Sequence, residues 1–212
     1  MSPELEAKAL LSKMVTDVYG RSLGHVIGVN RNQYGEMEGL EIESLGGNVI
    51  DVPAKSIMLT PKTITVTPEW KLDAQQVVSE ITTVKKRLLA LEGLRGKGDV
   101  EIEIYQELLE GQESGYLSKV KEAEAIANTV RTKLDYTNHR LSSLTRHLVN
   151  AKLDHQSGMI DEASFKLALG SIEPSIKPLI MEKNDLSTTL KSLENLIPTR
   201  VKAIETLAPS NK

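Results

Sequence analysis

The chain has 212 residues, of which 40% are hydrophobic and 26% are charged, a composition typical of globular or helical proteins. Aromatic residues make up only 3% of it, and compact cores normally use more such rings to fill their volume. We therefore expect much of the chain to fold without a compact core. The net charge of -3 excludes a protein that is basic overall, although local basic surfaces are compatible with it.

Features of membrane and secreted proteins are missing from the sequence. A membrane-spanning helix is not expected, because no run of about 18 apolar residues occurs. The first six residues, MSPELE, lack the basic and apolar regions of a secretory signal. The absence of cysteine excludes disulfides, thiolate nucleophiles and cysteine zinc sites, and it favours a cytoplasmic location.

Charge and glycine content divide the chain near Glu69. Residues 1–69 hold six Lys/Arg against nine Asp/Glu, whereas residues 70–212 hold twenty of each. Half of the 14 glycines lie between residues 20 and 47. We predict an N-terminal extension at 1–12, a β domain at 13–69, a helical domain at 70–207 and a short tail at 208–212.

Short β-prone runs separated by turn sequences predict a small antiparallel β domain. The candidate strands cover residues 23–29, 36–43, 48–52 and 63–67. Apolar and acidic residues alternate between residues 38 and 43, which places Leu40 and Ile42 on one buried face. About five or six strands in so short a segment must curl into a barrel, because a flat sheet would expose its edges.

Two parts of the β domain resemble a known family. The string KMVTDVYGRSLGHV at residues 13–26 resembles the opening of the PRC-barrel family, and VIDVP at 49–53 followed by Ile57 fits it too. PRC barrels serve as adaptor modules in unrelated systems. The junction TITVTPEWK at residues 63–71 narrows the resemblance to the CdvA family of archaeal cell-division proteins, and this resemblance covers roughly residues 10–200.

The resemblance to the CdvA family implies a non-enzymatic scaffold of cell division. Such a protein would form filaments in the cytoplasm at the division site, peripheral to the membrane and the nucleoid, and would position ESCRT-III-like proteins. It would also associate with DNA and with the membrane surface. The competing hypotheses are a dimeric adaptor, whose barrel captures a protein or an RNA without polymerising, and an accessory subunit of an enzyme.

The C-terminal tail departs from the family pattern. Members from the best-known lineage carry a flexible polar linker after the coiled coil and then a short apolar peptide that adds a strand to a winged-helix domain of the ESCRT-III-like partner. Here only five residues follow Leu207. We therefore expect that deletion of residues 208–212 leaves partner binding and self-assembly intact.

Apolar residues spaced alternately by four and three predict long coiled-coil helices, because this period keeps them facing a partner helix. The first series is Trp70, Ala74, Val77, Ile81, Val84, Leu88 and Leu91. The second runs from Tyr116 to Ala151 and includes Val130, Leu134, Leu141, Leu144 and Leu148. A third stripe includes Ile176, Leu179, Leu186, Leu190, Leu193, Ile197 and Ile204.

Glycine and proline mark the expected helix ends. Gly93, Gly96 and Gly98 should end the first helix, and Ser157-Gly158 the second. A short helix should start near Asp161, and Pro174 and Pro178 should mark another break. Two long antiparallel helices, at 116–155 and 176–207, would then form a hairpin with a connector near 157–175.

The helices are expected to contact a second copy as well as each other. Packing within the hairpin needs no partner, but the first series has no third helix of matching length in its own chain. We therefore predict a homodimer or a larger assembly. The predicted self-association seam consists of Trp70, Val77, Ile81, Val84, Leu88, Leu91, Val130, Leu134, Leu141, Leu144, Leu148, Leu186, Leu190 and Leu193.

Charge is segregated along the helical part. Residues 99–113 carry six acidic residues and no Lys or Arg. Residues 131–152 carry a basic stripe of Arg131, Lys133, Arg140, Arg146 and Lys152 against a single acid. In a parallel dimer Lys133 and Arg140 would face uncharged residues, so the stripe favours an antiparallel or staggered partner, such as the acidic stretch of another copy. A solvated face and a contact with DNA phosphates are the alternatives.

No motif for catalysis, metal or nucleotide is recognised. His139, His147 and His155 follow one another at intervals of eight, whereas a helical metal pair needs a spacing of about four. Gly20, Gly24 and Gly28 match no phosphate-binding loop and are interpreted as turn and bend glycines. We expect no catalytic residue, no cofactor and no small-molecule substrate.

Overall fold

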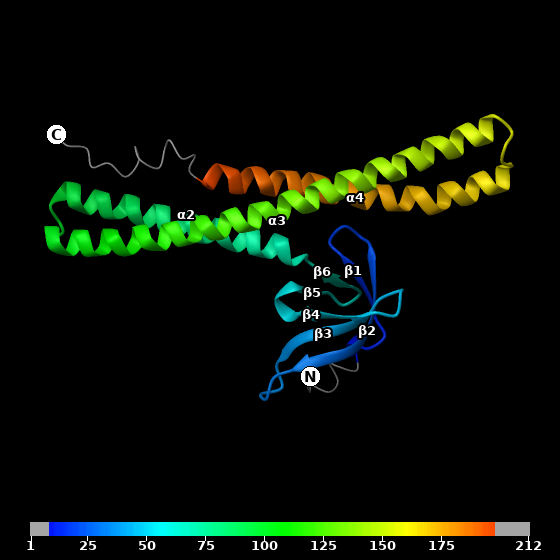
Figure 1. Ribbon diagram of the computed structural model, residues 1–212. Helices are drawn as coiled ribbons and strands as arrows, with labels where there is room; N and C mark the ends of the chain where they lie inside the picture. The colour runs from blue at the N-terminus through cyan, green and yellow to red at the C-terminus, as the bar shows by residue number, and fades with distance from the viewer. Residues whose placement is uncertain (1–8, 198–212) are drawn as a thin grey trace. The chain divides into compact units, whose positions relative to one another are not determined.

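A computed structural model describes residues 9–197. Six strands are followed by three long helices (Figure 1). The chain divides into two compact units. Among the described residues, the first unit comprises 9–72 with 137–183, and the second comprises 73–136 with 184–197.

The β domain of the first unit is a six-stranded half-barrel sheet. Its strands are β1 (Met14–Asp17), β2 (Ser22–Arg31), β3 (Met37–Glu43), β4 (Val49–Pro53), β5 (Ile57–Leu59) and β6 (Ile64–Val66), and a 3-10 turn, η1 (Ala54–Ser56), joins β4 to β5. The strand order is β4-β3-β2-β1-β6-β5. The four expected strands are confirmed as β2, β3, β4 and β6; β1 and β5 are additional.

The expectation of a purely antiparallel sheet is wrong at one pair. β1 pairs with β2 in antiparallel fashion but with β6 in parallel, with Val15 opposite Ile64. β1 is the first strand of the domain and β6 the last, so the long connection between them allows the chain to return in the same direction. This pairing joins the start of the domain to its end, directly before the first long helix.

Alternating residues of the strands form the core of the half-barrel. Leu40 and Ile42 are fully buried, which confirms the predicted face of β3. The other buried core residues are Val15, Val26, Val52, Ile64 and Val66. Gly24 has a φ of +140°, and a Cβ at this position would lie 1.9 Å from the carbonyl oxygen of Glu43. Only glycine therefore allows β2 to approach the end of β3 this closely.

The helices are longer than their sequence patterns suggested. They are α2 (Glu69–Lys97), α3 (Ile102–Gln156) and α4 (Glu162–Leu196). Gly93 and Gly96 lie inside α2, and Gly98, with a φ of +74°, follows its last residue. Of the three glycines expected to end this helix, Gly98 is confirmed and Gly93 and Gly96 are wrong, because helix hydrogen bonds continue until the chain adopts a left-handed conformation.

Pro174 and Pro178 do not break the third helix, which corrects both the expected break and the long connector. Both prolines lie inside α4, and the connector between α3 and α4 covers only residues 157–161. A proline removes one helix hydrogen bond to the carbonyl four residues earlier. For Pro174 this is the carbonyl of Gly170, and both residues are exposed, so water can hydrate it. Buried Leu179 and Leu186 hold the helix in place beyond them.

In the second unit, α2 and α3 lie side by side in antiparallel orientation (Figure 1). Glu80 forms an ion pair with Lys119 at 2.6 Å, and nearer the turn the guanidinium of Arg95 lies 4.8 Å from the ring centroid of Tyr105. The sequence prediction that the first helix lacks a partner within its own chain is therefore wrong. The reason is the length of α3: its 55 residues extend far enough to pair with α2 before they pair with α4.

In the first unit, the last part of α3 and the first part of α4 form a helical hairpin. The carboxylate of Asp161 accepts a hydrogen bond from the backbone N–H of Ser164 at 2.8 Å. This contact caps α4. Hydrogen bonds from the side chain of Ser164 and then from its backbone lower the pKa of Asp161. His155 at the end of α3 stacks on Phe165 of α4, with ring centroids 4.4 Å apart, and pairs with Glu162 at 3.0 Å. The antiparallel hairpin predicted for these helices is confirmed.

Candidate functional site

The residues of the predicted self-association seam face the interior of their own chain to different degrees. Buried members are Trp70, Val77, Ile81, Leu91, Val130, Leu186 and Leu193. Half-buried members are Val84, Leu88, Leu134, Leu141, Leu144, Leu148 and Leu190. Because the buried members pack within the chain, only the half-buried members offer surface to a second copy without opening the helices. The role of the seam in self-association stays a prediction.

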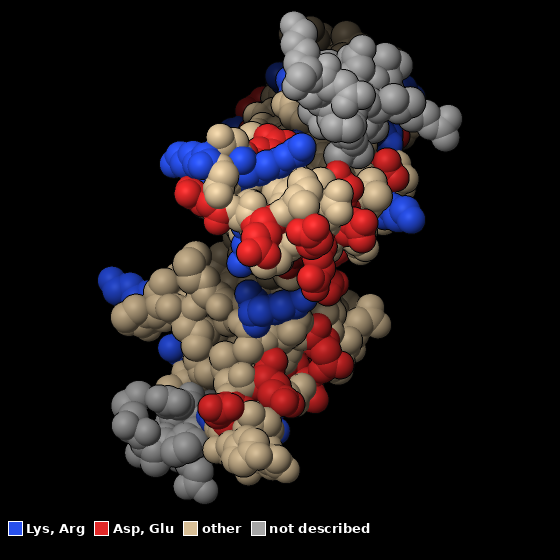
Figure 2. Space-filling model, turned by 90° about the vertical axis from the view of Figure 1, so that its left-hand side faces the viewer, with Lys and Arg blue, Asp and Glu red and all other residues tan. Residues whose placement is uncertain are grey.

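The predicted acidic stretch, residues 99–113, begins in the turn between α2 and α3 and continues along the start of α3. Three of its four helical acids, Glu103, Glu107 and Glu110, are exposed on α3 on the side opposite to buried Tyr105, and the fourth, Glu113, is half-buried. Ile104 and Leu108, both also about half exposed, lie beside them. Figure 2 faces the side on which this turn lies, where acidic side chains adjoin uncharged surface. This arrangement combines negative charge with apolar area, which suits a partner that is both basic and apolar.

The predicted basic stripe is not uniform. Arg131 pairs with Glu194 of α4 at 2.9 Å and donates a hydrogen bond to Asn128. Lys133, Arg140, Arg146 and Lys152 are exposed, and none of these four has an ion pair within residues 9–197. Those four side chains are therefore available to an anionic partner, whereas Arg131 is already occupied.

The hairpin of the first unit carries a shallow apolar groove with a volume of about 360 Å³. Leu148 of α3 lines one wall, and α4 supplies the rest of the lining: Glu173, Ile176, Lys177, Ile180 and Met181. Ile180 and Met181 remain 43% exposed. Sequence reasoning did not find this groove, because it depends on how two helices distant in sequence pack.

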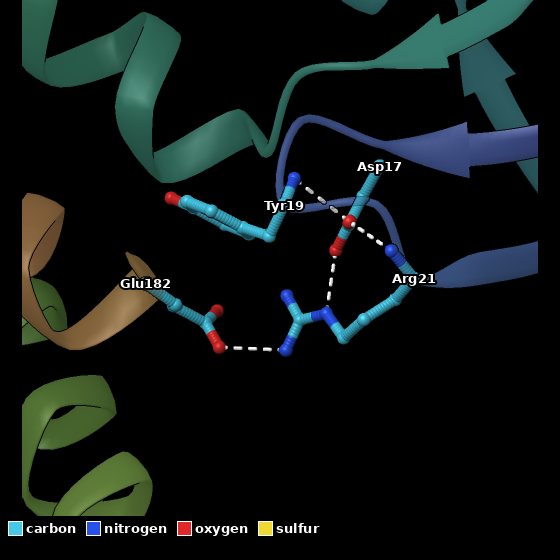
Figure 3. Close-up of polar contacts among 4 residues, drawn as sticks. All are labelled: Asp17, Tyr19, Arg21 and Glu182. Carbon is cyan, nitrogen blue, oxygen red and sulfur yellow. Dashed lines mark hydrogen bonds and ion pairs between the residues drawn. The ribbon is translucent and has the colours of Figure 1, made fainter. Parts of the chain in front are cut away.

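A polar cluster connects the β domain to α4 within the first unit (Figure 3). Asp17, at the end of β1, is buried, and its Oδ1 accepts hydrogen bonds from the backbone N–H groups of Tyr19 and Arg21, each at 2.9 Å. The second oxygen of Asp17 accepts a hydrogen bond from Nε of Arg21 at 2.6 Å. The carboxylate therefore organises the turn between β1 and β2 and orients the Arg21 side chain.

Arg21 extends the cluster to α4. Its terminal nitrogen donates to Oε2 of Glu182 at 2.6 Å, and its guanidinium lies 5.2 Å from the centroid of the Tyr19 ring. Burial lowers the pKa of Arg21, but the hydrogen bonds to Glu182 and Asp17 outweigh it and raise the pKa. A guanidinium held between two carboxylates by charge-assisted hydrogen bonds is a positioning contact, because it fixes where the turn and α4 meet.

This cluster was only partly visible in the sequence. The sequence predicts a turn at Tyr19-Gly20-Arg21, and an acid two to four residues before turn donors is the usual signal for such a cluster. Glu182 was missed, since it lies 161 residues from Arg21 and no local pattern connects them.

Residues 9–197 contain neither a cluster of metal ligands nor a helix that could cross a membrane. No group of three His, Cys, Asp or Glu side chains lies close enough to hold a metal ion there. None of the helices in this part of the chain combines the length and the hydropathy that crossing a bilayer requires.

The sequence of the helical part identifies the family to which the chain belongs. The profile of the CdvA-like coiled-coil domain matches residues 69–212, which is more than half of the chain. The chain belongs to the CdvA family. The matched region begins at the first residue of α2, so it contains all three helices of the described structure.

A relative within the CdvA family extends the similarity into the β domain. The chain is 23% identical over 186 residues to the protein named Cell division protein A of Sulfolobus acidocaldarius, and the alignment covers 88% of this chain and 78% of that protein. An alignment of this length includes at least part of the β domain as well as the helices. The two proteins therefore share more than the coiled coil.

Proposed function

We propose that this member of the CdvA family is a non-enzymatic structural protein of cell division that assembles with copies of itself into filaments. The observation that carries the proposal is the similarity to Cell division protein A over 88% of the chain, β domain and helices together. Exposed apolar and charged surfaces on the helices, at the α2–α3 turn and in the hairpin groove, support the self-assembly part of the proposal.

Within this function, the assembled protein positions an ESCRT-III-like partner at the division site and associates with DNA and the membrane surface. The four exposed basic residues of α3 support the DNA contact, because phosphates accept Lys and Arg without any base-specific geometry. A pull-down with the ESCRT-III-like partner tests recruitment. We expect binding to survive deletion of residues 208–212, which lie outside the described residues; loss of binding would assign recruitment to the tail.

Electron microscopy of the purified full chain, with and without DNA, tests self-assembly most directly. The proposal expects filaments that lengthen with protein concentration. Sedimentation over the same concentration range measures the fraction of assembled protein. A discrete dimer at every concentration would contradict the proposal and favour the adaptor hypothesis.

One observation supports that second candidate, a dimeric adaptor. The edge strands β4 and β5 carry exposed apolar residues, among them Val49 at 58% and Met58 at 55% exposed. Exposed edges of this kind can accept a strand from another protein. Replacement of Val49 and Met58 by Lys should abolish partner capture by an adaptor, whereas it should leave filament formation through the helices unchanged.

A further inference from the structure

One face of α3, next to the α2–α3 turn, is not covered by any described part of the chain. Ile104 and Leu108 lie one turn apart and are each 48% exposed. Gly111 and Gly115 continue the same face at helical spacing. We call residues 104, 108, 111 and 115 the open face of α3.

The two glycines of the open face weaken the helix without serving the packing of their own chain. Glycine in a helix interior is less favourable than alanine, because its unfolded backbone has more freedom to lose. No described heavy atom outside the local helix lies within 4 Å of the place that a Cβ would take at Gly111 or Gly115. A position without a side chain allows another backbone to approach closely, so the glycines suit a neighbour from outside the chain.

The open face is bordered by negative charge. Glu103, Glu107 and Glu110 are exposed along its edge, and none of the three has an ion pair within residues 9–197. A partner of the open face should therefore combine an apolar surface with basic side chains at its border.

The hairpin groove has these properties. Leu148, Ile176 and Ile180 provide an apolar lining. Lys177 lines the groove, and Lys152 follows Leu148 by one helical turn. Neither lysine forms an ion pair with the described residues. The acid Glu173 lies four residues before Lys177 and limits the basic surface on that side.

We propose that the open face of α3 in one copy docks in the hairpin groove of a second copy. Ile104 and Leu108 would enter the apolar lining, and the bordering glutamates would approach Lys152 and Lys177. The open face extends about 17 Å and the α4 side of the groove about 12 Å at the helical rise, so the groove would cover about two-thirds of the open face. This inference rests on the proposed self-assembly and names its contact surfaces.

The contact joins two different surfaces, so it is heterologous. Each copy that docks through its open face still presents an empty groove to the next copy. A heterologous contact whose rotation does not close a ring produces an open filament. The contact therefore accounts for polymerisation, whereas a contact between two identical surfaces would end at a dimer.

The glycines provide the first experiment. Gly111→Gln together with Gly115→Gln should increase the helix signal in circular dichroism and the melting temperature, because glutamine favours helices and both positions are open. The same change should raise the critical concentration for assembly at least about tenfold, measured by sedimentation. The reason is that the two glutamine side chains would occupy the space that the second copy needs for close approach. Gly93→Gln is the matched control, since Gly93 is an equally open helix glycine on α2, outside the open face.

Charge exchange provides the second experiment. One variant carries Glu103→Lys, Glu107→Lys and Glu110→Lys, and the other carries Lys152→Glu and Lys177→Glu. Each variant alone places like charges across the contact and should stay unassembled in light scattering. An equimolar mixture should assemble again, because each open face then meets a groove of opposite charge.

Three outcomes would overturn the inference. Assembly of both charge variants at the wild-type concentration would show that the contact lies elsewhere or that the groove holds another protein. A mixture that stays unassembled would show that the two surfaces do not meet. Failure of the wild-type chain to form polymers would refute the proposed self-assembly itself, whereas wild-type polymers with unaffected variants would refute only the assignment of the surfaces.

Discussion

At the scale of single residues, backbone conformation at glycine limits what the β domain tolerates. Gly24→Ala should destabilise the chain by more than about 2 kcal/mol, because a Cβ would overlap the Glu43 carbonyl and the positive φ adds strain. Urea denaturation followed by circular dichroism measures the change. Gly35→Ala is the matched control, because the φ of Gly35 is also positive, at +83°, but no heavy atom lies within 4 Å of the added Cβ. We expect this substitution to lower the free energy of unfolding by about 1 kcal/mol. Equal losses would show that β2 and β3 are farther apart than described.

Arg21 is the second residue whose role can be isolated. Its side chain is 32% exposed, and that of Glu182 is 15% exposed. We expect Arg21→Ala to cost about 1–2 kcal/mol of unfolding free energy, because it leaves the buried Asp17 with only backbone donors. A double-mutant cycle with Glu182→Gln should give a coupling energy of at least about 0.5 kcal/mol. Strict additivity of the two substitutions would mean that the contact does not form in solution.

At the scale of the elements, the ion pair between α2 and α3 makes the stability of the second unit depend on pH. Hydrogen bonds from Lys119 and then Gln76 lower the pKa of Glu80 from 4.5, and bonds to Glu122 and Glu80 raise the pKa of Lys119 to about 12. A lowered folded-state pKa means that the Glu80 contribution is present above about pH 4.5 and is lost as the pH falls through the lowered value. The Lys119 contribution is complete below its ordinary value of 10.5 and is lost as the pH rises through about 12.

We therefore expect Glu80→Gln to lower the unfolding midpoint more at pH 7 than at pH 2.5, because the contribution of the carboxylate declines as the pH falls below 4.5 through the lowered pKa. Thermal melts at the two values, followed by circular dichroism at fixed ionic strength, measure this difference. Glu124→Gln is the control, since Glu124 is an exposed acid of α3 without an ion pair in the described residues. A midpoint shift for Glu80→Gln that is equal at both pH values would contradict the ion pair.

At the scale of the whole molecule, the basic residues of α3 make DNA binding testable. Replacement of Lys133, Arg140 and Arg146 by Gln should weaken binding to all DNA sequences alike, because phosphate contacts carry no base information. The slope of log affinity against log salt should fall by about 0.9 for each lost contact. Arg131→Gln should change affinity less, since Arg131 already pairs with Glu194. Titrations of labelled duplexes at several salt concentrations measure both quantities; unchanged affinity of the triple variant would exclude this surface from DNA binding.

The half-buried seam residues make the proposed self-assembly testable. Leu141→Glu combined with Leu144→Glu would place two charges in the hairpin of the first unit, where both leucines are half-buried. We expect loss of assembly and a cost of several kcal/mol in unfolding free energy. Light scattering and circular dichroism should change together, and full assembly of a chain that remains helical would show that this part of the seam is not a contact.

The periodic spacing of apolar residues was sufficient to predict many of the strands, helices and buried residues of this protein. Alternation in β3 predicted that Leu40 and Ile42 are buried, and the four-three spacing predicted helices whose buried residues include Val77, Ile81 and Val130. Both are local patterns, since a strand or a helix fixes which neighbours in sequence share a face. The junction at residues 63–71 carried the family resemblance for the same reason: it is a continuous string.

Tertiary structure decided the features that join distant residues. The parallel pairing of β1 with β6, the contact of Arg21 with Glu182, and the pairing of α2 with α3 leave no periodic signal in the chain. The local sequence also could not predict that α4 continues through Pro174. Proline destabilises a helix interior and so favours a break, and only the packing of the helix residues after Pro174 offsets this cost. Sequence patterns report which side of an element is apolar, whereas the element that covers this side depends on the free energy of the whole fold.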